Sequence, residues 1–328
     1  MPDIRDEYRI IVESAGWIER PGRGRLRLDG ADVASFLQAL LSNDVSHVAP
    51  GQGVHATYLT PTGRMLADLE IYRRAGDWLV GLAAERAPVI AEKLDQSIFA
   101  EDVRVADVTA TTAEIVVTGG AAAAVAGQAL GVASERLDAL AELEHLAWND
   151  GFVARLGDST LPMFTIVVPV ARRQEVASAL DAAGVRSISV ALVEALRIDA
   201  GRPRFGADMT EDTIPLEAGL LDRAISTTKG CYVGQEIVIR ILHRGGGRVA
   251  KRLMTMTIDE PPDGGEPARG ASLLDEGKVV GHLTSVSPSL RTPGLIALGY
   301  AQRDAAEIGR RFGVADTSLV ATVTGVAR

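Results

Sequence analysis

The same order of elements occurs twice in the first two thirds of this chain, and this repetition constrains the fold most. Residues 66–83 contain two strand-like segments around an Ala-Gly-Asp turn, and a helix-like segment follows at 85–96. Residues 151–156 and 163–170 are again strand-like, and a helix-like segment follows at 171–183. Two strand–strand–helix units predict two mixed α+β lobes of ferredoxin-like type, each with helices packed on an antiparallel sheet.

The last part of the chain has a different pattern. After three consecutive glycines at 245–247, short strand-like segments alternate with turns. These segments lie at 251–258, 271–274, 278–286, 295–302 and 318–325. Such spacing is typical of a small Greek-key β-barrel. We therefore predict an α+β fold with two domains, an α+β region of two intertwined lobes at 1–244 and a C-terminal barrel at 245–328.

A long loop at 201–228 leads into the segment KGCYVGQE at 229–236. Loops of more than about twenty residues in a compact domain are usually binding loops or disordered. This loop contains apolar side chains such as Phe205 and Leu216, so we expect it to be ordered. The sequence therefore places a candidate binding region directly before the only cysteine, Cys231.

The surroundings of Cys231 leave two interpretations open. A lone cysteine is most often a small buried apolar residue without reactivity. Here its neighbours are polar or turn-forming residues, and Lys229 supplies a nearby positive charge. A thiol beside a cation and at the start of an ordered element would be shifted toward the thiolate. We expect a functional thiol.

Composition and charge exclude several classes of protein. The net charge of −9, from 34 basic and 43 acidic residues, argues against a protein that binds nucleic acid over its whole surface. No apolar run approaches the length of a membrane span, about 18 residues. A single cysteine excludes a disulfide framework and suits a reducing compartment, so we expect a cytoplasmic protein. The five histidines are scattered, so we predict no metal site.

Three segments carry a resemblance to a known family. KGCYVGQE at 229–236 is the most specific, followed by LRIDAGRPRFGADMTEDTIPLEAGL at 196–220 and, more weakly, the segment at 36–72. With them the chain resembles the YgfZ-type folate-binding proteins, relatives of the glycine-cleavage T-protein, an aminomethyltransferase. The resemblance covers nearly the whole length. It implies a three-lobed T-protein-like fold around a central channel for folate, with the C-terminal barrel as one lobe.

The resemblance also implies roles for individual residues. Asp199 lies at the position of the family's pterin-binding carboxylate, which is usually a glutamate. The alternative is that Asp199 is a helix-terminal aspartate bonded to its own loop. Asp68 aligns with one of two adjacent acids in a family segment where an aspartate acts at the folate nitrogen, and Ala67 stands at the other position. Asp68 and Cys231 are thus the catalytic candidates. The further candidates for cofactor binding are Arg197, Lys229, Tyr232, Gln235, Glu236 and Arg248.

For Arg248 the argument is electrostatic. It belongs to a basic stretch at 240–252, which either faces solvent or holds the anionic glutamate tail of a folate.

The function implied by the resemblance is support of iron–sulfur cluster assembly or repair that depends on tetrahydrofolate or a one-carbon derivative of it. Iron–sulfur enzymes that modify tRNA would be among the beneficiaries. The alternative is an enzyme, a folate-dependent aminomethyltransferase or other one-carbon transferase. A third possibility is an interaction scaffold with a vestigial site. The expected partners are folate and, transiently, iron–sulfur proteins or assembly factors, with no nucleic acid and no membrane, and the expected state is a monomer.

Overall fold

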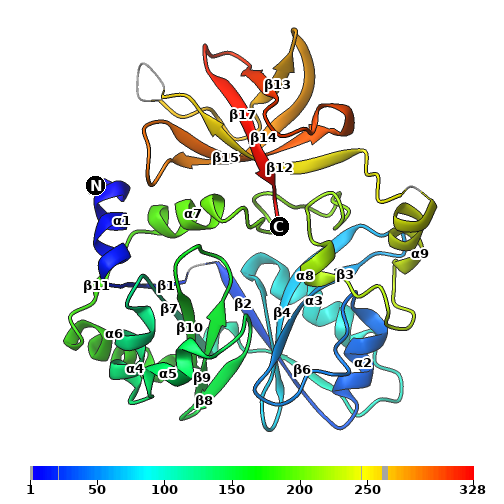
Figure 1. Ribbon diagram of the computed structural model, residues 1–328. Coiled ribbons are helices and arrows are strands. Elements are labelled where there is room, and N and C mark those ends of the chain that lie inside the picture. Colours follow the sequence, from blue (N-terminus) through cyan, green and yellow to red (C-terminus); the bar gives the residue numbers. More distant parts are fainter. Residues whose placement is uncertain (1–2, 21, 245, 261–264) are drawn as a thin grey trace.

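Two β-sheet lobes and a closed β-barrel make up the computed structural model of the protein (Figure 1). The structure describes residues 3–20, 22–244, 246–260 and 265–328. Figure 1 shows the helix α7 (Val190–Asp199) lying between the barrel and the two sheets. The predicted α+β fold class, with two sheet lobes and a C-terminal barrel, is confirmed.

The first lobe is a five-stranded sheet with the strand order β3–β4–β5–β2–β6. Its strands are β2 (Arg23–Asp29), β3 (Gly53–Leu59), β4 (Met65–Arg73), β5 (Trp78–Ala83) and β6 (Arg104–Asp107). The helices α2 (Val33–Leu40) and α3 (Ala87–Asp95) cover its apolar face. Along β4 the burial alternates, so that Asp68 lies on the less buried face of the sheet with Leu66 and Glu70. The polar face of this sheet is the one available for a site.

The second lobe is a six-stranded sheet with the order β11–β1–β7–β10–β9–β8. Its strands are β1 (Gly16–Glu19), β7 (Thr112–Thr118), β8 (His145–Trp148), β9 (Gly151–Leu156), β10 (Met163–Pro169) and β11 (Arg186–Ser187). The helices α4 (Ala122–Leu130) and α6 (Arg173–Ala182) pack on one face, near the short α5 (Ser134–Asp138). On the other face, α1 (Ile4–Glu13) and α7 join the apolar core. Because both faces are covered, the central strands β7, β9 and β10 are buried almost throughout.

The barrel closes in the order β12–β15–β14–β13–β16–β17. Its strands are β12 (Lys251–Ile258), β13 (Ser272–Asp275), β14 (Lys278–Pro288), β15 (Leu295–Gln302), β16 (Arg311–Val314) and β17 (Val320–Val326). The strands β13, β14 and β15 are paired in chain order, and β15 then pairs with β12, which precedes all three in the chain. This arrangement is a Greek key. The predicted domain boundary falls at residue 245, which lies outside the described residues, and the division there stays a prediction.

A buried histidine joins the two sheet lobes. The imidazole ring of His145 lies 5.8 Å from the ring of Tyr72 in the first lobe and 4.9 Å from that of Phe152 in the second. The backbone N–H of His145 donates to the carbonyl of Gly51, again in the first lobe. Burial lowers the pKa of His145 to about 4. The ring is therefore neutral in the folded protein at neutral pH.

This histidine should make the lobe contact sensitive to acid. Between its ordinary pKa of about 6.5 and the lowered value, the unfolded chain binds a proton that the folded ring resists. The free energy of unfolding should therefore fall as the pH drops through this range, and His145→Phe, which keeps an aromatic ring, should flatten the dependence. Urea unfolding of both proteins at several pH values between 7 and 4 tests this. Parallel curves for the two proteins would show that His145 does not cause the loss.

Candidate active site

A cavity of about 360 Å³ lies where the two lobes, α7 and the segment 203–206 meet. One part of its wall is apolar, formed by Ile18, Val116, Leu143, Leu156, Met163, Val190, Val193 and Phe205. Its charged and polar side chains are those of Arg20, Arg23, His55, Asp68, Glu70, Glu85, Glu142, Asp158, Glu194, Arg197, Arg204 and Arg223. The volume and the mixed lining are typical of a site for a small molecule or cofactor.

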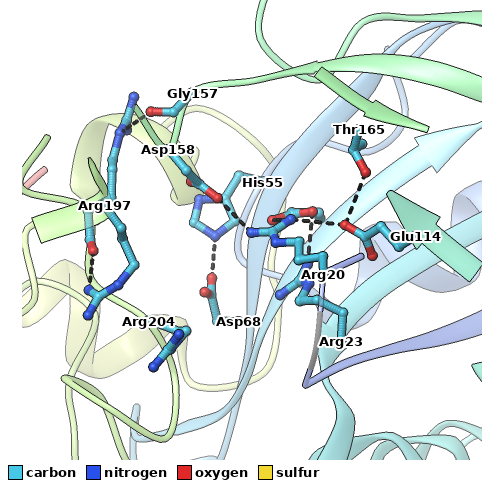
Figure 2. A network of polar contacts seen from close by, with 12 residues as sticks. Arg20, Arg23, His55, Asp68, Glu114, Gly157, Asp158, Thr165, Arg197 and Arg204 are labelled. Atoms are coloured by element: carbon cyan, nitrogen blue, oxygen red, sulfur yellow. Dashed lines mark hydrogen bonds and ion pairs between the residues drawn. The ribbon is translucent and has the colours of Figure 1, made fainter. Parts of the chain in front are cut away.

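Asp68 on β4 and His55 on the neighbouring strand β3 form a hydrogen-bonded pair at this cavity (Figure 2). The side chains are 16% and 8% exposed. Burial alone would raise the pKa of the Asp68 carboxyl, but His55, Arg23 and Arg223 outweigh burial and lower it. Asp68 is therefore an ionised carboxylate held in place at the wall of a cavity, which is what a proton acceptor requires.

An ion-pair network lies beside this pair and joins the two lobes. Arg20 donates to Glu114 at 3.0 Å and to Asp158 at 2.7 Å, and it lies 3.7 Å from Glu70 on β4 of the first lobe. The hydroxyl of Thr165 donates to Glu114 (Figure 2). Burial alone would raise the pKa of the Glu114 carboxyl, but the surrounding arginines outweigh burial and lower this pKa. The network fixes the wall of the cavity by paired charges.

A second carboxylate reaches the cavity from α7. Glu194 accepts from Arg197 Nη2 at 2.5 Å and forms an ion pair with Arg204, whose Nη1 lies 2.9 Å from Glu194 Oε2. The helix begins at Ser189, whose hydroxyl accepts from the N–H of Leu192 as an N-cap. Glu194 and Arg197 are three residues apart and so lie on the same side of the helix. This i, i+3 pair was the signal in the sequence that could have identified Glu194, which the sequence analysis missed.

The structure places Asp199 away from this cavity. Its carboxylate accepts from Arg291 Nη1 at 2.8 Å, and it borders a separate hollow beneath the barrel. Asp199 follows Glu194 by five residues, which turns the side chain by about 140° around the helix. The two carboxylates therefore face different sides of α7. Glu194, and not Asp199, is therefore the carboxylate of α7 that lines this cavity, and the pterin contact expected of Asp199 stays a prediction.

Lys229 is bound to the protein itself. Its ammonium donates to the backbone carbonyls of Gln38 at 2.7 Å, Leu41 at 2.6 Å and Asn43 at 3.0 Å. These carbonyls lie at the end of α2, where a helix leaves such groups without partners. The same ammonium lies 5.2 Å from the ring centre of the buried Tyr232. Lys229 and Tyr232 thus anchor the cysteine segment to α2, and neither lines the cavity.

The remaining candidates of this region lie at the surface. Cys231 is free and exposed, and the amide of Gln235 donates to the carbonyl of Gly230 within the same segment. Glu236 pairs with Arg240 one turn later, along α9 (Gln235–Ile239), and Arg248 is exposed. None of these side chains lines the cavity. Of the site residues expected from the sequence, the structure brings only Asp68 and Arg197 together there.

Within the described ranges, no group of three or more His, Cys, Asp or Glu side chains is placed to hold a metal ion. The chain has one cysteine, whereas common iron–sulfur clusters are held by several thiolates. No helix in the part of the chain that the structure describes is both long and apolar enough to span a membrane.

Comparison with known proteins agrees with this architecture. Residues 1–229 match the family described as GCVT N-terminal domain, and residues 251–325 match the glycine cleavage T-protein C-terminal barrel domain. The chain is 28% identical to an aminomethyltransferase of Nostoc sp., covering 94% of this chain and 82% of the relative. An aminomethyltransferase of Cutibacterium acnes is 29% identical, with 98% and 86% covered.

The fold is also that of a solved T-protein. The crystal structure of glycine cleavage system aminomethyltransferase T from Bartonella henselae superposes with a TM-score of 0.86, covering 98% of this chain and 88% of that one at 22% identity. The two family matches together span both sheet lobes and the barrel. The chain therefore belongs to the glycine cleavage T-protein (GCVT) family.

Proposed function

We propose that the cavity binds a reduced folate, tetrahydrofolate or a one-carbon derivative, and that the protein transfers a one-carbon unit of the aminomethyl type. One observation carries this proposal. An ionised carboxylate, Asp68, and a second carboxylate, Glu194, line the same cavity together with several apolar side chains. The relatives named as aminomethyltransferases support it.

The lining suits the chemistry of a folate. A pterin presents an amino group and ring N–H groups, which a carboxylate such as Glu194 can accept as paired hydrogen bonds. The apolar side chains, Phe205 among them, suit its aromatic ring systems. The glutamate tail is anionic, and Arg204, with its side chain 53% exposed, and Arg223 are cations of the same lining. These residues replace the basic stretch around Arg248 as the proposed partners of the tail.

When bound, a reduced folate supplies the nitrogen that accepts the one-carbon unit. As the one-carbon unit leaves its donor, whose bond to the unit breaks, and bonds to that nitrogen, the carboxylate of Asp68 accepts the proton that the nitrogen loses, or stabilises positive charge that develops beside it. The hydrogen bond from His55 holds the carboxylate in one orientation, since the imidazole is itself buried between neighbouring strands. His55 is thus a positioning residue for Asp68.

Glu194→Gln should weaken the binding of tetrahydrofolate by about tenfold or more, because a hydrogen bond to a charged group contributes about 1.5–3 kcal/mol. The matched control is Asp199→Asn, the same change of charge on the other side of α7, which should leave the affinity unchanged. Calorimetric titration of the wild type and both variants distinguishes the two carboxylates. If Asp199→Asn abolished binding and Glu194→Gln did not, the pterin would be held by Asp199 and the assignment made here would fail.

The exposed Cys231 favours a second candidate function. We propose that the chain belongs to the YgfZ branch of the family and supports iron–sulfur cluster assembly or repair, with Cys231 meeting a partner protein or a cluster at the surface. The segment KGCYVGQE carries the resemblance, and Lys229 anchors the segment so that the thiol stays accessible. The proposal includes that the protein is a monomer in a reducing, cytoplasmic compartment, which agrees with a single free thiol.

Replacing Cys231 separates the two functions. Cys231→Ala should leave the affinity for tetrahydrofolate within about twofold, because the thiol does not line the cavity. In cells depleted of the native protein, the same variant should fail to restore the activity of iron–sulfur enzymes. Full restoration by Cys231→Ala would exclude a role of the thiol in that function and leave the transferase proposal untouched.

A further inference from the structure

A buried polar network connects the C-terminal barrel with the cavity. At its centre is Asp208, in the irregular segment after α7, whose side chain is 0% exposed. Its Oδ1 accepts from the hydroxyls of Thr284 at 2.6 Å and Ser285 at 2.7 Å, both on β14 of the barrel. Its Oδ2 accepts from Arg197 Nη1 at 2.7 Å. Asp208 therefore bridges a barrel strand and a residue of the cavity lining.

Arg197 has every N–H donor of its guanidinium occupied. Nη1 donates to Asp208 and to the carbonyl of Arg202 at 2.6 Å, while Nη2 donates to Glu194 and to Ser285 Oγ at 2.9 Å. Nε donates to the second oxygen of Glu194 at 3.2 Å. A planar cation with all its donors bonded has one orientation. The paired bonds to both oxygens of Glu194 transmit that orientation to the carboxylate in the cavity.

The same network holds the cavity segment 203–206. Arg197 fixes the carbonyl of Arg202 just before it, and the N–H of Arg204 donates to Asp208 at 3.1 Å. From the barrel side, Arg269 donates to the carbonyls of Gly206, at 2.7 Å, and Ala207. Two independent contacts therefore run from the barrel to the lining of the cavity. One reaches Glu194 through buried side chains, and the other reaches the backbone of the segment.

We propose that the barrel positions the ligand-binding carboxylate of the cavity through a relay from Thr284 and Ser285 to Asp208, Arg197 and Glu194. Thr284, Ser285 and Asp208 are positioning residues, since they do not line the cavity. The inference rests on the proposed binding of a reduced folate at Glu194. It assigns to the barrel a role in ligand affinity as well as in stability. Both hydroxyls donate to the same buried oxygen of Asp208, which has no access to water. Solvent therefore cannot replace a hydroxyl donor that is removed.

The test uses a double variant in the barrel, Thr284→Val with Ser285→Ala, which removes both hydroxyl donors with little change in volume. Calorimetric titration with tetrahydrofolate should give an affinity about three- to tenfold weaker than that of the wild type. The control is Thr324→Val, which removes a barrel hydroxyl that contacts Thr255 at 3.0 Å and has no contact with Asp208. Thermal unfolding of each variant establishes that the fold is retained. Equal affinity of the wild type and the double variant would overturn the relay.

A second measurement separates positioning from a general loss of order. In a Glu194→Gln background, the double variant should cause no further loss of affinity, because the relay acts through Glu194. Additive losses would overturn the proposal, since the barrel change would then act by another route. Absence of tetrahydrofolate binding by the wild type itself would instead remove the proposed function. The two failures are therefore distinguishable.

Discussion

Asp68→Asn is expected to lower the rate of one-carbon transfer to tetrahydrofolate by about 10²- to 10⁴-fold. Asparagine has the shape of aspartate but cannot accept a proton or stabilise a developing positive charge. Because the amide still fits beside His55, the affinity for folate should change little. The measurement is the formation of methylene-tetrahydrofolate and ammonia from an aminomethyl donor, with calorimetry on the same samples. A rate equal to that of the wild type would exclude Asp68 from the chemistry.

The pH dependence provides a further check on Asp68. Its folded-state pKa is lowered by His55, Arg23 and Arg223, so the carboxylate stays charged at every pH above its ordinary value of about 4. The rate should therefore show no loss from protonation of Asp68 between neutral pH and about pH 4. His55→Gln keeps a hydrogen-bond donor beside the carboxylate, and it should reduce the rate less than Asp68→Asn does.

Asp208→Ala is expected to lower the free energy of unfolding by about 3–5 kcal/mol, because it removes a fully buried carboxylate that pairs with the Arg197 cation and accepts from Thr284 and Ser285. Burial alone would lower the pKa of Arg197, but Asp208 and Glu194 outweigh burial and raise that pKa in the intact protein. Urea unfolding at neutral pH measures the change.

The control for this change is Asp199→Ala. It breaks the pair with Arg291, whose side chain is 49% exposed, and it should cost about 0–1 kcal/mol. If the two substitutions destabilised the protein equally, the pair of Asp208 and Arg197 would contribute no more than an exposed ion pair, contrary to the role that its burial implies.

The architecture followed from local patterns. Period-two alternation predicts β4 and places Asp68 with Leu66 and Glu70, and the structure confirms this. The barrel strands followed from turns between short apolar runs, although β16 (Arg311–Val314) was not predicted. That strand is short and carries an exposed arginine and a glycine, so it has little period-two signal.

The site depended on contacts between distant parts of the chain, which patterns do not encode. The pairing of His55 with Asp68 depends on the register of β3 and β4. The sequence interpretation placed the Lys229 charge beside Cys231, whereas its ammonium binds the carbonyls at the end of α2. For Asp199, alignment to a family motif identified the residue but not the side of the helix that faces the cavity.

The most direct test of the central claim is a crystal structure of the protein with tetrahydrofolate bound. We expect the pterin in the cavity between the two lobes, with its amino and ring N–H groups donating to Glu194 and the nitrogen that accepts the one-carbon unit within hydrogen-bonding distance of Asp68. A folate bound elsewhere, such as in the hollow beside Asp199 under the barrel, would contradict the site and the chemistry assigned to it.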